Sequence, residues 1–152
     1  MRRMLALTFL LAAAASSARA QEEGSLGAGV VAGNPTGVTA KYWLNGLQAI
    51  DLGVGFSGDP AFYADFLWHA WDMIAQPKQG HLGVYAGLGP RIEAKSQAQF
   101  GVRTIAGLSY WLPRHPIELF LDGGPVFVLT PDWTVNADIG LGVRFYFGPS
   151  KG

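Results

Sequence analysis

The sequence predicts an all-β protein of eight antiparallel strands, on three observations. From Ser25 onward apolar and polar residues alternate with a period of two, which is the repeat of a β-strand and not of a helix. Turn-forming residues interrupt the alternation at intervals of roughly ten to twenty residues, as they do between short strands. The 152 residues are 49% hydrophobic and 14% charged and include no Cys. This composition excludes a disordered chain, a disulfide-stabilised scaffold and a zinc module built on cysteines.

The first twenty residues have the pattern of a secretory signal peptide. Arg2 and Arg3 give a positive start, residues 4–15 are apolar except for Thr8, and residues 18–20 form a small-x-small cleavage site. The apolar run is shorter than the roughly 18 to 20 residues that a membrane-spanning helix needs. We therefore expect residues 1–20 to be a signal peptide and residues 21–152 to form one domain.

The eight strands are justified in order by the apolar residues that recur at every second position. We predict strands at 25–33, 37–44, 48–57, 61–71, 81–95, 100–112, 117–130 and 133–147. Their apolar faces, in the same order, are Leu26/Ala28/Val30, Val38/Ala40/Tyr42/Leu44, Ile50/Leu52/Val54/Phe56, Phe62/Ala64/Phe66/Trp68, Leu82/Val84/Ala86/Leu88, Phe100/Val102/Ala106/Leu108, Ile117/Leu119/Leu121 and Ile139/Leu141/Val143/Phe145/Phe147. The connectors contain Asn-Pro, Asn-Gly, Gly-Asp-Pro and Pro-Asp sequences, and the longest of them is 72–80.

The opposite face of the strands collects the charged residues, five basic and six acidic. Besides Lys95, these are Lys41, Asp51, Asp65, Arg91, Glu93, Arg103, Glu118, Asp122, Asp138 and Arg144. The same face is crowded with glycine, which weakens a strand but leaves room for large side chains inside a narrow barrel. Charges that nearly cancel are typical of an interior, because an unpaired buried ion costs several kcal/mol.

Two folds share this alternation: a soluble barrel with the apolar face inside, and a membrane barrel with the apolar face outside. Aromatic residues gather near predicted strand ends, as in the two girdles of a membrane barrel. They are Tyr42, Trp43, Phe62, Trp68, Phe100, Tyr110, Trp111, Trp133, Phe145 and Phe147. In a membrane, a Lys or Arg on the lipid face costs up to about 2–4 kcal/mol, so the charged face must point inward. The sequence thus favours an eight-stranded antiparallel up-and-down transmembrane β-barrel, with Ile139, Leu141, Val143, Phe145 and Phe147 of the last strand facing lipid.

Two prolines fall inside predicted strands. Because proline cannot donate to a strand ladder, Pro90 and Pro125 are expected at bulges or rims. A bulge around residues 123–125 would reverse the faces beyond it. The sequence leaves open whether Val126 and Val128 or Phe127 and Leu129 face outward.

The chain resembles a known family at four stretches: 33–44, 49–51, 63–69 and 140–147. They are similar to an uncharacterised family of small outer-membrane barrels, also found in spirochaetes, whose architecture is like that of the OmpA transmembrane domain. The last strand also resembles the C-terminal signal of bacterial outer-membrane barrels, although residues 148–152 follow Phe147. The resemblance implies a location in the outer membrane and brings no established catalytic residues.

We interpret the charged face as a structural ion network that fills the lumen, with a porin-like narrow channel for ions or small solutes as one alternative and a soluble lipocalin-like binder of apolar ligands as another. Catalysis by His69, Ser109 and Glu118 is not favoured, because no local motif links them. We expect no enzyme activity, no cofactor and no metal site, since the histidines lack close ligand spacing.

The expected partners follow from location and charge. Without Arg2, Arg3 and Arg19 the chain has eight basic and eleven acidic residues, a net charge of −3, which disfavours nucleic acid. The partners expected are outer-membrane lipids, lipopolysaccharide and the barrel assembly machinery, with the protein itself monomeric. If the first strand rises from the periplasm, the long 72–80 connector is periplasmic and the outer loops are short.

Overall fold

The computed structural model describes residues 23–147, which form eight strands. The predicted signal peptide at 1–20 lies outside the described residues. The strands are β1 (Leu26–Asn34), β2 (Gly37–Trp43), β3 (Gln48–Gly55), β4 (Ala61–Ala70), β5 (His81–Glu93), β6 (Gln99–Trp111), β7 (Ile117–Thr130) and β8 (Thr134–Phe147). Each predicted strand is present, with ends that differ from the prediction by no more than two residues.

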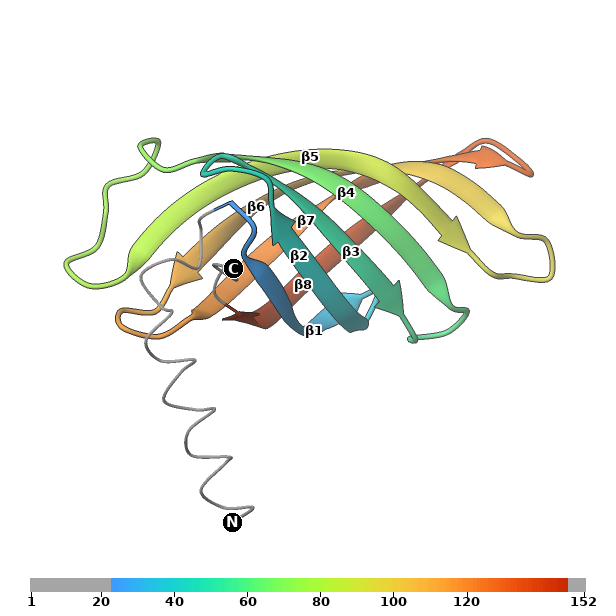
Figure 1. Cartoon of the computed structure of the whole chain (residues 1–152). Coiled ribbons are helices and arrows are strands. Elements are labelled where there is room, and N and C mark those ends of the chain that lie inside the picture. Colours follow the sequence, from blue (N-terminus) through green and yellow to red (C-terminus); the bar gives the residue numbers. More distant parts are fainter. Residues whose placement is uncertain (1–22, 148–152) are drawn as a thin grey trace, which may run out of the picture.

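The strands close into one barrel (Figure 1). Every consecutive pair is antiparallel, and β1 pairs with β8 from Leu26–Phe147 to Asn34–Ile139. Over the length of this pairing, closure leaves no sheet edge, so each strand has a neighbour on both sides. The predicted fold class, an all-β barrel of eight antiparallel up-and-down strands, is confirmed. None of the described residues forms a helix long and apolar enough to cross a membrane.

The strands that form the barrel wall differ in length. Strands β2 and β3 have seven and eight residues, whereas β7 and β8 have fourteen each. We call the end where β1 begins and β8 ends the termini end; it also carries the connectors 44–47, 71–80 and 112–116. The opposite end, the loop end, carries the connectors 35–36, 56–60, 94–98 and 131–133.

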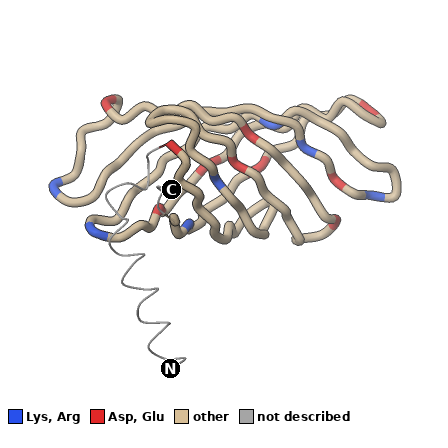
Figure 2. The backbone as a smooth tube through the Cα atoms, in the orientation of Figure 1, with Lys and Arg blue, Asp and Glu red and all other residues tan. Residues whose placement is uncertain are grey.

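The alternation of the sequence becomes the two faces of the wall. Leu141 and Ile139 are each 61% exposed on the outside, whereas Arg144 of the same strand is 1% exposed on the inside. Large apolar side chains cover the outer surface of every strand, as expected from the period of two. Charged positions of neighbouring strands lie close together along the middle of the barrel (Figure 2).

Strand β7 keeps one alternation throughout, which settles the open question around residues 123–125. Val126 and Val128 are buried inside at 1% and 2% exposure, and Leu129 is exposed outside. The register shift of this part of the barrel lies instead at the rim, between Phe100 and Gly101 of β6. One extra residue of β7 lies between the two partners there, so only the last pair, Phe100 with Thr130, is shifted.

The expectation of a bulge or a rim position is wrong for Pro125, and Pro90, three residues before the end of β5, does not mark a bulge. Pro125 lies in the middle of β7 and pairs with Ala137 of β8, and Pro90 pairs with Val102 of β6, both without a local register shift. Each strand residue directs its N–H toward one neighbour only, so a proline loses one ladder bond and leaves the other side intact. Pro125 has a paired residue in β8 but none in β6. On the β6 side, the Thr104 hydroxyl donates to the Pro125 carbonyl at 2.9 Å.

Candidate functional site: the ion pairs of the lumen

The ten charged residues predicted for the lumen come from seven of the eight strands. Nine of them are buried: Lys41, Asp51, Asp65, Arg91, Arg103, Glu118, Asp122, Asp138 and Arg144. The tenth, Glu93, lies nearer the loop end, with 17% of its side chain exposed. Alternation puts each of them on the inner face, and the register then decides which of them meet.

A first cluster, nearer the termini end, has two basic and two acidic residues. Arg144 bonds Glu118 at 2.7 Å through Nη1 and Asp51 at 2.8 Å through Nη2, so one guanidinium joins β3 to β7 across the lumen. Lys41 Nζ lies 3.5 Å from Glu118 Oε2 and 2.8 Å from His69 Nε2. The four charges cancel, as a water-excluded group of ions requires.

Neutral side chains complete the first cluster. The Tyr146 hydroxyl donates to Glu118 Oε2 at 2.7 Å, and the Thr39 hydroxyl donates to Asp51 Oδ1 at 2.6 Å. The Arg144 guanidinium also lies 3.8 Å above the centre of the Phe120 ring. Each carboxylate therefore has a charged and an uncharged donor, which is how a buried ion pair compensates lost hydration.

A second cluster, nearer the loop end, is built around Arg103. Its guanidinium lies 3.2 Å from Asp65, 3.4 Å from Asp138 and 3.8 Å from Asp122. Arg91 bonds Asp138 and Glu93, each at 3.0 Å. The Arg103 guanidinium is stacked 3.8 Å from the centre of the Tyr63 ring, which fixes its plane.

Tyr85 connects the two clusters. Its hydroxyl donates to Asp122 Oδ2 at 2.7 Å, and Lys41 Nζ lies 5.2 Å from the centre of its ring. A cavity of about 10 Å³ lies between Pro35, Tyr63, Arg103 and Asp122. That space is about one water molecule, so the packing at this level of the lumen is close to complete.

For the uncharged members of the network, sequence reasoning predicted the inner face but not the partners. Thr39, Tyr85 and Tyr146 lie on the predicted inner face, and alternation was the signal available for them. Their partners are 12, 37 and 28 residues away along the chain. Only the register of the closed barrel brings these pairs together, which a single sequence does not contain.

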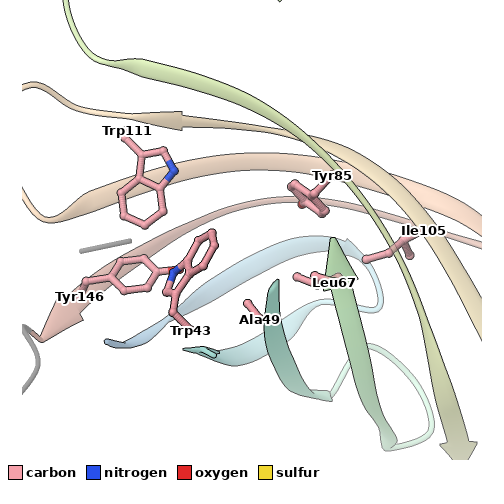
Figure 3. Close-up of a cluster of buried hydrophobic side chains, with 7 residues drawn as sticks. All are labelled: Trp43, Ala49, Leu67, Tyr85, Ile105, Trp111 and Tyr146. Carbon is pink, nitrogen blue, oxygen red and sulfur yellow. The ribbon is translucent and has the colours of Figure 1, made fainter. Parts of the chain in front are cut away.

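The termini end of the lumen is filled by aromatic side chains. Trp43, Trp111 and Tyr146 point inward and toward one another, with the Trp111 and Tyr146 ring centres 4.7 Å apart (Figure 3). The inward direction of Trp43 and Trp111 corrects their assignment to the outer aromatic girdle. Tyr42 precedes Trp43 and Tyr110 precedes Trp111, and adjacent residues of a strand face opposite sides.

The residues considered for catalysis do not form a triad. His69 contacts Lys41 and the Leu47 carbonyl, and Glu118 is held by Lys41, Arg144 and Tyr146. The buried Ser109 hydroxyl has no hydrogen-bond partner among residues 23–147, so no base activates it there. In the same range, no group of three or more His, Cys, Asp or Glu is placed to hold a metal ion.

The fold and its filled interior define a class: small closed up-and-down barrels with the OmpA-like arrangement of eight strands. The chain is similar to the crystal structure of the N-terminal β-barrel domain of Pseudomonas aeruginosa OprF, with a TM-score of 0.61 and 18% sequence identity. The match covers 84% of this chain and 100% of the OprF domain. No family model and no curated protein sequence matches the chain.

Proposed function

We propose that this protein is a small outer-membrane β-barrel with a structural role in the bacterial envelope and a lumen closed by its own side chains. The observation that carries the proposal is the division of the wall into an apolar outer face and a charged inner face. Arg144 and Glu118 are buried inside, while Leu141 and Ile139 are exposed outside. A soluble barrel of the same shape would need the reverse arrangement.

The energetics of a membrane favour this orientation. Each basic residue at mid-bilayer on the lipid face would cost about 2–4 kcal/mol, and an unpaired sheet edge would leave backbone groups unsatisfied in hydrocarbon. The inward charges and the closed ladder avoid both costs. In the proposed orientation, the lipid-facing residues of β8 are Ile139, Leu141, Val143, Phe145 and Phe147, and the ten lumen residues form a structural ion network.

The remaining assignments belong to the same proposal. They are export by a signal peptide at 1–20, insertion of the domain at 21–152 by the barrel assembly machinery, and contact with outer-membrane lipids and lipopolysaccharide as a monomer. Membership of the family of small outer-membrane barrels that the sequence resembles is proposed on the four stretches quoted above and on the similarity of fold to OprF.

Cell fractionation tests the proposal. The protein is expected in the outer-membrane fraction, to resist release by osmotic shock, and to be extracted by detergent as a band whose gel mobility changes on boiling. Recovery in the soluble periplasm without detergent would contradict the membrane location and favour a lipocalin-like binder. The charged interior speaks against that alternative, because an apolar ligand would have to displace paired ions.

A further inference from the structure

Strand β8 extends beyond its partner β1 at the loop end. The pairing of β1 with β8 ends at Asn34–Ile139, whereas β8 itself begins at Thr134 and pairs with β7 from Val128–Thr134 onward. Residues 134–138 therefore have a neighbouring strand on the β7 side and none on the β1 side. Figure 1 shows this part of β8 in the orange hairpin that projects past the ends of β1 and β2.

The unpaired backbone groups of this edge follow from the geometry of the ladder. In an antiparallel pair, the N–H and C=O of one residue point toward the same neighbour, and those of the next residue point away from it. The Ala137 carbonyl accepts from Asn34 Nδ2 at 3.2 Å, so Ala137 and Val135 point toward the β1 side. The N–H and C=O of Val135 and the N–H of Ala137 consequently have no strand partner among residues 23–147.

The side chains along this edge do not protect it. Native proteins usually blunt an exposed edge with Lys, Pro or a β-bulge. Residues 133–137 are Trp-Thr-Val-Asn-Ala, and their pairing with β7 has no register shift. Trp133 and Val135 are also exposed, at 66% and 52%. The edge is therefore open to the addition of another strand.

The charges around this edge are mostly negative. The second ion cluster and the connectors of the loop end together contain three basic and six acidic residues: Arg91, Lys95 and Arg103, and Asp59, Asp65, Glu93, Asp122, Asp132 and Asp138. The other charged residues between 23 and 147 balance, four against four: Lys41, Lys78, Arg114 and Arg144, and Glu23, Asp51, Asp72 and Glu118. The excess negative charge of the described chain thus lies entirely toward the loop end, where it attracts a basic partner.

From the free edge and the charge around it, we propose that residues 134–137 of β8 bind a basic, extended segment of another protein, which adds to the barrel wall as a strand. In strand addition, main-chain hydrogen bonds give affinity and alternate side chains give specificity. One face of the added strand would lie beside Val135 on the outside, and the other beside Thr134 and Asn136 on the inside. A segment in which apolar and basic residues alternate fits both faces.

A second copy of this chain does not fit the same edge. Two copies would bring their acidic loop ends together, and like charges across an interface oppose association. In the proposed membrane, two copies also share one direction, and barrel strands tilt by about 35–45°. Two β8 strands related by a two-fold axis along the membrane normal would cross at about 70–90° instead of lying antiparallel.

A fluorescently labelled synthetic peptide, Lys-Val-Lys-Val-Thr-Val-Lys, tests the edge. Its dissociation constant from the detergent-solubilised barrel is measured by fluorescence anisotropy. Val135→Pro removes the N–H that points away from β7, so the ladder to β7 stays intact, and Val135→Thr keeps this N–H as the matched control. The peptide is expected to bind the unaltered barrel and V135T with equal affinity, and V135P at least about tenfold more weakly.

Two altered peptides make the test independent of how well V135P folds. A fully N-methylated peptide keeps its charge and loses its backbone donors, and it should bind the unaltered barrel at least about tenfold more weakly. A peptide with Glu in place of each Lys should show no binding up to about 1 mM. Only protein that still shows the boiling-dependent shift in gel mobility is scored.

Three results would overturn the proposal. The first is no binding of the basic peptide up to about 1 mM. The second is undiminished binding both to V135P and by the N-methylated peptide, which would mean that the acidic end attracts cations without strand pairing. The third is a dimer of the unaltered barrel that V135P dissociates, which would assign the edge to a second copy. Because every measurement is made on detergent-solubilised barrel, these failures are distinct from a failure of the proposed membrane location.

Discussion

Arg144 makes the two shortest ion pairs of the lumen network, at 2.7 and 2.8 Å. Its planar guanidinium bonds carboxylates from two strands and stacks on Phe120, a combination that lysine, with a single ammonium group, does not reproduce. Asp51 and Glu118 depend on it, since both are almost completely buried.

Replacing Arg144 by Ala is expected to lower the free energy of unfolding by about 3–5 kcal/mol, because two buried carboxylates lose their closest cation. Arg144→Lys should recover part of this loss. The measurement is urea unfolding of the detergent-solubilised barrel. Lys78→Ala, in the exposed part of the connector 71–80, is the matched control and should be neutral; an equally small loss for R144A would contradict the structural role of the network.

Glycine also stabilises the lumen, because it leaves space where large side chains cross it. A Cβ at Gly107 would fall 2.5 Å from Tyr85 Cζ and 2.7 Å from Asp122 Cβ, between the two groups that join the ion clusters. Gly107→Ala is therefore expected to destabilise the barrel by about 1–3 kcal/mol through overpacking. Gly46→Ala is the control, since no atom lies within 4 Å of a Cβ there. Equal thermal stability of the two variants would show that the lumen repacks freely.

At this scale the sequence predicts the face of a residue but not its partner. Alternation was sufficient to place Lys41 and Glu118 inside. It gave no means to see that they meet across 77 residues of chain, or that Tyr146 completes their bonding. Girdle residues were assigned by their position near strand ends, and the neighbours Tyr42 and Trp43 could not both be outward.

At the scale of the element, β8 displays both faces of the wall along its whole length. Leu141 lies near the middle of its outer face, and Val135 lies on the same face near the loop end, 52% exposed. The two positions differ in expected depth in a bilayer and share the same strand and direction.

Leu141→Lys is expected to cost about 2–4 kcal/mol of folding free energy in lipid vesicles, and Val135→Lys about 0–1 kcal/mol, because the penalty for a charge depends on its depth. Both changes in folding free energy are measured by following folding into lipid vesicles at increasing urea concentrations. In a water-soluble barrel the two exposed positions would tolerate lysine equally, so equal effects would refute the lipid-facing assignment of β8.

Strand β7 shows what could not be predicted at this scale. The alternation of apolar and polar residues is clear in the sequence up to Gly123. Whether Pro125 reverses the two faces beyond it depends on which neighbouring strand loses the hydrogen bond. The answer, the β6 side with Thr104 opposite, follows from the barrel register. Strand number and strand ends were predictable because each depends on residues close together in the chain.

For the whole molecule, the two ion clusters and the aromatic end together predict a closed lumen. In planar bilayers the protein is expected to give no stable conductance steps, because paired charges and ring stacks occupy the axis from Arg103 to Trp111. The control is Arg144→Ala combined with Trp111→Ala, which removes one barrier of each kind and should raise the frequency of openings. Reproducible steps from the unaltered chain would favour the narrow-channel alternative.

The unequal length of the strands has a consequence for the bilayer in which the barrel is proposed to lie. A strand needs about 9–11 residues to cross the hydrocarbon layer, so β2 and β3, with seven and eight residues, are too short while β7 and β8 are ample. In the proposed membrane location, lipids beside β2 and β3 would compress their acyl chains, at a fraction of a kcal/mol per ångström. The barrel would therefore thin the membrane only on the side formed by β2 and β3. A second barrel with equally short strands would share this deformation if it lay on that side, and the two would diffuse together.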